Sequence, residues 1–144
     1  MIVRELLLSL IGCLLTGCTT ATDGLTTNRP AVDLSGPAVG AIAGDMVSRF
    51  AEQVGPEINS VRLIEDASPF GQAMEAALKG WGYVVVTDEK IEEKKRTIAL
   101  AYTVDDFAGQ ALVSISAGSV ELARAYATSA TGASPASAVS VRRN

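Results

Sequence analysis

Few residues of this chain could do chemistry, and histidine is absent from all 144 positions. That absence removes the commonest general base and the commonest metal ligand. Adjacent carboxylates occur at Glu92–Glu93 and Asp105–Asp106, in segments expected to be solvated. We find no nucleophile motif, phosphate-binding glycine loop or metal-ligand spacing. The sequence therefore predicts a protein that is not an enzyme and that uses no metal or separate cofactor. An acidic pair or a Ser–Lys pair assembled by folding is the alternative left open.

The most specific chemical signal is a cysteine at the end of an N-terminal apolar run. Residues 6–15 are far shorter than the roughly 20 residues needed to span a bilayer, and they lead into Leu15-Thr16-Gly17-Cys18. This is the lipobox pattern of bacterial lipoprotein precursors. It predicts cleavage after Gly17 and the attachment of diacylglycerol and an N-acyl chain to Cys18. An ordinary signal peptide or a buried helix is the competing interpretation.

Cys13 is a second cysteine in a similar context, because Leu10-Ile11-Gly12-Cys13 also fits the pattern. Processing there would leave about five apolar residues before the cut, below the usual 7–15. Cys18 is therefore preferred, and the mature chain then has no second cysteine for a disulfide. Thr19 stands where an aspartate would favour inner-membrane retention. We therefore expect a lipid anchor in the inner leaflet of the outer membrane, on its periplasmic face.

The segment after the anchor is rich in Thr, Gly, Pro, Asn and Asp and has no sustained periodicity. Such a segment buries too little apolar surface to offset its ordering entropy, so residues 18–36 are expected to be an extended tether. Its apolar residues Val32 and Leu34 are candidate contacts with a partner protein, in the alternative where the tether docks. The predicted organisation is a signal peptide over 1–17, the tether over 18–36 and a globular domain over 37–144.

Two helices are predicted from capping residues and apolar spacing. Ser35 and Pro37 begin the first, and Gly55-Pro56 ends it. Its apolar face consists of Val39, Ile42, Ala43, Met46, Val47, Phe50 and Val54. Gly40 and Gly44 would weaken this helix and permit close approach of another backbone. The second helix starts at Ser68-Pro69 and closes at Lys79-Gly80, and its apolar face consists of Phe70, Met74, Ala77 and Leu78.

Strands are predicted over residues 59–65, 81–86 and 97–104, with the charged residues 88–96 as a solvated connection. Trp81 is more often core than an interface anchor, and both interpretations stay open. A turn is expected at 105–110, followed by a hairpin of 111–117 with 120–128 across Gly118-Ser119.

The predicted core face of the second hairpin strand carries Val120, Leu122 and Tyr126 and is interrupted by Arg124. A last strand is expected over 136–142, with Val139 and Val141 pointing inward. This order of elements predicts an α+β domain with two helices packed on a mostly antiparallel sheet. The net charge of −4 argues against direct nucleic-acid binding, which needs a basic surface.

Beyond the lipobox and tether, three segments resemble the TrbH family of conjugal transfer lipoproteins. They are Ala41-Ile42-Ala43-Gly44-Asp45-Met46-Val47, Phe70-Gly71-Gln72-Ala73-Met74-Glu75-Ala76-Ala77-Leu78 with Gly80-Trp81-Gly82-Tyr83-Val84-Val85, and Leu122-Ala123-Arg124-Ala125-Tyr126. The resemblance implies a structural lipoprotein of the outer-membrane core complex of a conjugative type IV secretion channel. It implies TrbG-like and TrbI-like channel subunits as partners, and copies of the chain itself in a ring. It also implies a fold like the N-terminal domain of secretins.

Two alternatives stay open: a pilotin-like assembly lipoprotein of another secretion machine, and a ligand-binding envelope lipoprotein. The ligand-binding alternative would need a deep apolar pocket with a few convergent polar groups.

Overall fold

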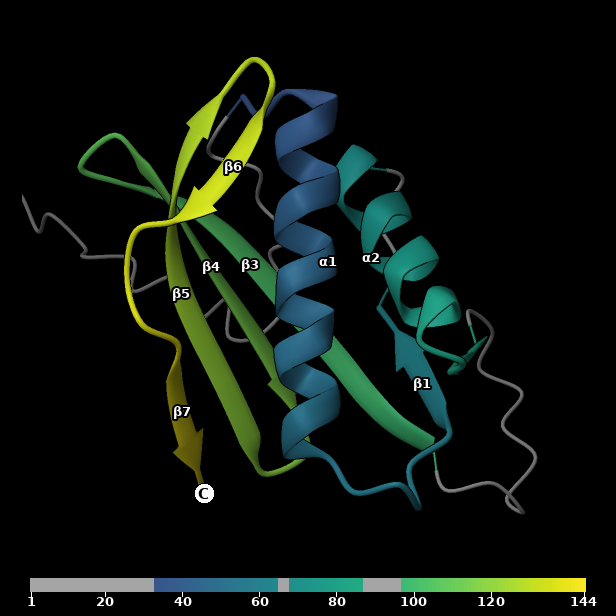
Figure 1. Ribbon diagram of the computed structural model, residues 1–144. Coiled ribbons are helices and arrows are strands. Elements are labelled where there is room, and N and C mark those ends of the chain that lie inside the picture. Colours follow the sequence, from purple (N-terminus) through teal and green to yellow (C-terminus); the bar gives the residue numbers. More distant parts are fainter. Residues whose placement is uncertain (1–32, 65–67, 87–96) are drawn as a thin grey trace, which may run out of the picture.

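The computed structural model describes residues 33–64, 68–86 and 97–144 (Figure 1). Within them the elements follow in the order α1 (Gly36–Gln53), β1 (Ser60–Leu63), α2 (Pro69–Gly80), β2 (Val84–Val86), β3 (Thr97–Phe107), β4 (Gln110–Ala117), β5 (Val120–Ser129), β6 (Gly132–Pro135) and β7 (Ser140–Arg143). No helix among these residues is long and apolar enough to cross a membrane. The predicted connection over 88–96 lies entirely outside the described residues, within the segment 87–96.

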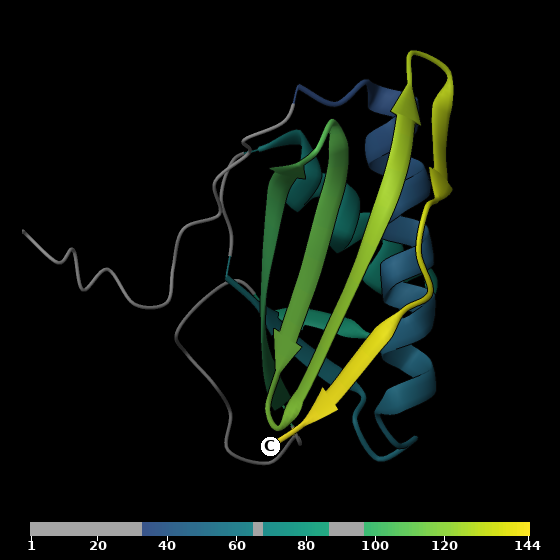
Figure 2. The ribbon, with the colours of Figure 1, turned by 90° about the vertical axis from the view of Figure 1, so that its left-hand side faces the viewer.

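The described strands form one sheet with the order β2-β1-β3-β4-β5-β6, and β7 pairs with β5 beyond the end of β6. β1 is parallel to both β2 and β3, and the other pairs are antiparallel. A helix joins β1 to β2, which is the connection that parallel neighbours require. Both helices lie on one face of the sheet, and no helix of the described residues lies on the other (Figures 1 and 2). The predicted α+β class is confirmed.

The start of α1 follows its capping chemistry. Ser35 is the N-cap, and its Oγ accepts a hydrogen bond of 3.2 Å from the backbone N of Ala38. The buried residues of the helix are Ala38, Val39, Ile42, Ala43, Met46, Val47 and Phe50, close to the predicted face. No described atom lies within 4 Å of a Cβ built at Gly40 or Gly44. Among the described residues, no backbone therefore makes the close approach that these glycines would permit.

The helix α2 closes at Gly80 as predicted, but its C-cap differs from the prediction. Gly80 is still helical and Trp81 is the C-cap, whereas Gly82 takes the left-handed conformation with φ of 92°. The backbone N of Tyr83 donates to Leu78 O at 3.1 Å, and that of Gly82 donates to Lys79 O at 3.0 Å. These two bonds form a Schellman motif, which satisfies the last carbonyls of the helix. The strand predicted to begin at Trp81 consequently begins at Val84.

The predicted turn over 105–110 is mostly strand. β3 continues to Phe107, and its pairing with β4 runs without a break from Leu100↔Ala117 to Phe107↔Gln110. The turn consists of Ala108 and Gly109, whose φ values of 52° and 77° are those of a type I′ turn. A two-residue turn of this kind matches the twist of the strands, so the acidic residues before it can extend the hairpin. The predicted hairpin across Gly118-Ser119 is confirmed.

The single last strand predicted over 136–142 is wrong. The chain instead pairs twice with β5, as β6 against residues 126–129 and as β7 against residues 120–123. Pro135 ends β6 because it has no N–H to continue the ladder. Between the two strands, Ser137 Oγ accepts a hydrogen bond of 3.0 Å from the backbone N of Ala125. Val139 packs against the core as predicted, but Val141 is 42% exposed.

The core lies between the two helices and the covered face of the sheet. Its largest fully buried side chains include Tyr126, Phe50, Ile42, Met46, Leu63, Met74, Leu78, Leu100, Ile115 and Leu122. On β3 the buried residues are Leu100, Tyr102 and Val104, and their neighbours Ala101 and Thr103 point to the other face, as the alternation predicted. The domain is therefore built on one continuous apolar cluster.

Candidate functional site

Trp81 is 54% exposed, so the prediction that favoured a core position for it is wrong. As the C-cap of α2 its backbone N donates to Ala77 O at 3.1 Å and to Leu78 O at 3.2 Å. The indole therefore projects from a fixed backbone at the end of a packed helix. A large aromatic side chain held in this way presents apolar area to a partner at little entropic cost.

Trp81 borders an open groove of about 320 Å³ where α1 and α2 both end. The lining residues carry no charge, and they are Ala51, Val54, Gly55, Pro56, Ile58, Asn59, Trp81, Gly82 and Tyr83. The ring of Tyr83 packs against the core, since its centroid lies 5.7 Å from that of the buried Phe50 ring. Val84, which is 49% exposed, follows immediately, and its backbone N donates to Asn59 O at 2.9 Å. We call this surface the Trp81 groove.

The composition of the Trp81 groove is that of the centre of a protein interface. Interface centres are depleted in charge and enriched in tryptophan and tyrosine. The Trp81 groove and Leu34 lie at opposite ends of α1, because Leu34 precedes the first turn of the helix and Val54 follows its last. Eighteen residues at about 1.5 Å each separate these ends by roughly 27 Å. The groove therefore lies about one helix length away from Leu34.

The predicted tether residues are only partly described. Leu34 is partly buried against the core, so the packed part of the chain begins by Leu34 rather than at residue 37. Its contact with a partner stays a prediction. Val32, Cys18 and the lipobox residues Leu15, Thr16 and Gly17 lie outside the described residues. Signal cleavage, acylation of Cys18 and the tether likewise stay predictions.

The sequence interpretation missed a polar brace between α1 and β5. Asp45 Oδ2 accepts hydrogen bonds from Arg124 Nη1 at 2.8 Å and from the Tyr126 hydroxyl at 2.7 Å. Arg124 Nε also donates to Ser137 O at 2.9 Å, which ties the segment between β6 and β7 to the same point. Arg124 was interpreted as an interruption of an apolar face. A charged residue beside the buried face of a strand was the available signal that Arg124 needs an acidic partner on the helix.

The contacts of Asp45 with Arg124 and Tyr126 join α1 to β5, and they do not activate any of the three groups. Burial and the hydrogen bond to Asp45 raise the pKa of Tyr126 well above its usual range, so its proton is held rather than released. Elsewhere, Asp106 Oδ1 accepts from the backbone N of Gly109 at 3.3 Å within the hairpin turn. Among residues 33–64, 68–86 and 97–144, no group of three or more acidic residues or cysteines is placed to hold a metal ion.

Fold and surface together define a small α+β domain that carries an uncharged, accessible groove suited to protein contact. The profile of the family described as "Conjugal transfer protein TrbH" matches residues 20–144. The chain is also 47% identical over 143 residues to the "Probable conjugal transfer protein TrbH" of Sinorhizobium fredii (strain NBRC 101917 / NGR234), covering 96% of this chain and 97% of that protein. The chain belongs to the TrbH family of conjugal transfer proteins, as the sequence resemblance predicted. No solved structure matches it, so the likeness to secretin N-terminal domains stays a prediction.

Proposed function

We propose that this protein is a structural lipoprotein of the outer-membrane core complex of a conjugative type IV secretion channel. Membership of the TrbH family supports the role in conjugation. The observation that carries the structural role is the uncharged Trp81 groove, which presents a half-exposed tryptophan from a rigid helix end. A surface of this kind serves to hold a partner in place.

In this proposal the acyl chains of Cys18 fix the protein to the inner leaflet of the outer membrane. The 14 residues between Cys18 and Asp33 span at most about 50 Å when fully extended. The domain thus stays close to the membrane yet can turn the Trp81 groove toward subunits in the periplasm. The partners are TrbG-like and TrbI-like channel subunits and further copies of the chain arranged in a ring. The contact with DNA is left to other components, which agrees with the net charge of −4.

The protein acts in this scheme as a non-enzymatic scaffold. Its best-formed polar cluster, around Asp45, is used to join α1 to β5. A ligand-binding role is less well supported, because the apolar cavity near Leu34 has a volume of about 140 Å³ and the Trp81 groove, of about 320 Å³, is an open surface groove and not a deep pocket. Ligand pockets usually enclose about 300–1,000 Å³.

Mating efficiency tests the proposal. A donor strain lacking the gene is complemented with the wild type, Cys18→Ser, Trp81→Ala or the matched control Val141→Ala, which removes a different exposed apolar side chain. We expect transfer to fall with Cys18→Ser and Trp81→Ala and to be unaffected by Val141→Ala. Wild-type transfer with Cys18→Ser would show that the anchor is dispensable. A deletion that leaves transfer unchanged would show that the protein is not required for conjugation.

Isolation of the native complex tests the partners. The detergent-solubilised wild type should co-purify with other channel subunits, and Trp81→Ala should recover less of at least one of them. A free monomer without channel subunits would contradict the scaffold role. Co-purification with the subunits of a different secretion machine would favour the pilotin-like alternative.

A further inference from the structure

The hairpin between β3 and β4 carries an exposed aromatic residue beside its turn. Phe107 is 62% exposed, the highest value among the large apolar residues of the described chain. It pairs with Gln110 across the type I′ turn of Ala108 and Gly109. A ladder of paired residues from Leu100 onward fixes its position, and the hairpin projects from the sheet at the upper left of Figure 1. Phe107 is therefore a rigidly presented apolar knob.

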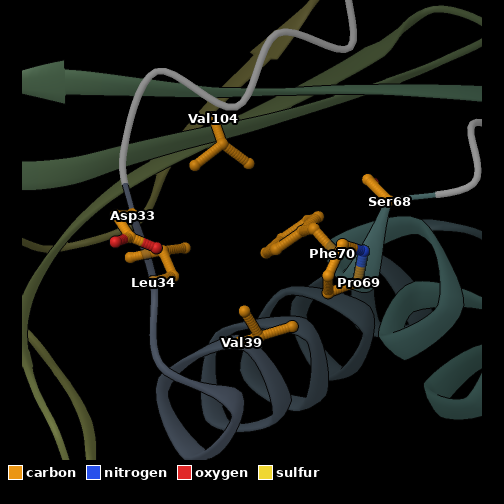
Figure 3. Close-up of a pocket in the computed structure, with 7 residues that line it drawn as sticks. All are labelled: Asp33, Leu34, Val39, Ser68, Pro69, Phe70 and Val104. Carbon is orange, nitrogen blue, oxygen red and sulfur yellow. The ribbon is translucent and has the colours of Figure 1, made fainter.

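An apolar cavity lies at the same end of the domain, between the starts of both helices and the end of β3. Its volume is about 140 Å³. Five apolar residues line it together with Asp33 and Ser68, and they are Leu34, Val39, Pro69, Phe70 and Val104 (Figure 3). Figure 3 shows these side chains arranged around an open space that none of them fills. We call it the Leu34 cavity.

The Phe107 side chain and the Leu34 cavity match in size and in apolar character. An apolar cavity of about 150 Å³ can hold a benzene molecule, so a phenyl ring fits the Leu34 cavity. The ring of Phe107 cannot fill the cavity of its own chain. Val104 points from β3 to the helices, whereas Phe107, three residues further on, points to the opposite face and lies about 10 Å along the strand. The two features are therefore available to different molecules.

The helix ends at the cavity favour the negative charge that the hairpin carries, whereas the rim residue Asp33 opposes it. The N-termini of α1 and α2 meet at the cavity, and neither helix has an acidic residue in its first turn. Helix N-termini favour negative charge nearby, and the hairpin brings Asp105 and Asp106 with Phe107. Of the described residues that line the cavity, Asp33 at the rim is the one acidic residue, and it reduces this attraction.

We propose that Phe107 of one copy inserts into the Leu34 cavity of the next copy. The contact joins two different surfaces, so it is heterologous, and repeated copies close into a ring when the rotation allows. The inference rests on the proposed function, in which copies of the chain surround a channel. It adds the residues that join one copy to the next.

The contact is weak between two isolated copies. One side chain in one cavity buries far less than the roughly 1,200 Å² of a stable interface. Attachment to one membrane raises the effective concentration of neighbours, and ring closure makes each contact support the others. The test therefore uses the full-length, membrane-attached protein.

Disulfide cross-linking between two differently tagged copies in donor cells tests the contact. One copy carries Gln110→Cys, beside Phe107, and the other carries Asp33→Cys, at the cavity rim. The described residues contain no cysteine of their own. Because each copy carries one of the two introduced cysteines, a disulfide between positions 110 and 33 can form only between copies. A copy with Glu57→Cys, in the turn after α1, replaces the Asp33→Cys copy as the control for random encounters.

We expect the Gln110–Asp33 pair to cross-link well above the Glu57 control. Phe107→Ala in the Gln110→Cys copy should lower that yield about tenfold, the effect of losing an anchor worth roughly 1.4 kcal/mol. Val141→Ala, which also removes exposed apolar surface, should leave it unchanged. Leu34→Trp in the Asp33→Cys copy fills the cavity and should block the cross-link, with thermal unfolding used to show that the variant folds.

A yield equal to the Glu57 control, or a yield insensitive to Phe107→Ala, overturns the contact. The mating assay separates this failure from that of the proposed function. Loss of transfer on deletion together with absent cross-links leaves the conjugative role intact and shows that copies meet elsewhere or not at all.

Discussion

Removal of the Asp45 carboxylate should destabilise the domain more than any exposed charge does. Asp45 Oδ2 holds both Arg124 and Tyr126, whose side chains come from the strand beneath α1. The Arg124 side chain is 15% exposed and that of Asp45 is 23% exposed, so water replaces the lost acceptor only in part. Asp45→Ala leaves a largely buried guanidinium and a buried hydroxyl without this acceptor.

The magnitude follows from the bonds lost. A hydrogen bond to a charged group contributes about 1.5–3 kcal/mol, and breaking a fully buried pair costs about 3–5 kcal/mol. Because the cluster retains some contact with solvent, we expect about 2–3 kcal/mol for Asp45→Ala. Tyr126→Phe removes one bond and leaves the Asp45–Arg124 pair, so it should cost about 1 kcal/mol. Asp45→Asn keeps one acceptor and should lie between the two.

Urea unfolding measures these free energies for the wild type, the three single variants (Asp45→Ala, Asp45→Asn and Tyr126→Phe) and the Asp45→Ala/Tyr126→Phe double variant. The double variant should be more stable than additivity predicts, by about 1 kcal/mol, because the two single changes remove the same bond. Glu75→Ala breaks the exposed ion pair with Lys79 and serves as the matched control, with a cost below about 0.5 kcal/mol. The reasoning is refuted if Asp45→Ala costs no more than Glu75→Ala, or if the two brace substitutions are additive.

Three further predictions concern separate features. Gly40→Ala should raise the free energy of unfolding by about 0.5–1 kcal/mol, because the residue is exposed and helical with no described atom within 4 Å of the new Cβ; a destabilised variant in urea titration would show an unrecognised contact. Stability should fall as the pH rises above about 10, because burial and the bond to Asp45 raise the pKa of Tyr126 in the folded state and the unfolded chain loses that proton first. The free energy of unfolding should then decrease by up to about 1.4 kcal/mol per pH unit. The decrease should be smaller in Tyr126→Phe, which has no phenolic proton. Trp81→Ala should change the thermal midpoint little while weakening co-purification with channel subunits, and a large loss of stability would mean that the indole is a core group despite its 54% exposure.

Local signals in the chain located most of the elements. Each helix begins at a serine followed by a proline, and these caps fixed both starts to within a residue. Strict alternation on β3 identified the buried Leu100, Tyr102 and Val104. Where the sequence interpretation failed, a competing local signal was misleading. Two aspartates and a glycine suggested a long loop, although a two-residue turn lets the strand run to Phe107.

The last third of the chain shows what pattern alone could not supply. Residues 132–143 pair twice with one strand, and nothing in their composition indicates that β5 is long enough to accept two partners in succession. The exposure of Trp81 has the same origin. Its neighbours in the sequence are those of a strand, but the Schellman motif centred on Gly82 turns the chain before the strand starts.

The sequence by itself determined the TrbH family, the α+β class and the helix starts, because each rests on a local motif or on the spacing of apolar residues. The lipid anchor at Cys18 stays a prediction from the same kind of local motif. The tertiary structure decided which side chains meet. It placed Arg124 against Asp45 across 79 positions, exposed Trp81 beside the end of α1, and set Phe107 and the Leu34 cavity at one end of the domain. These contacts depend on strand order and on the packing of the helices over the sheet, and no local pattern encodes either one.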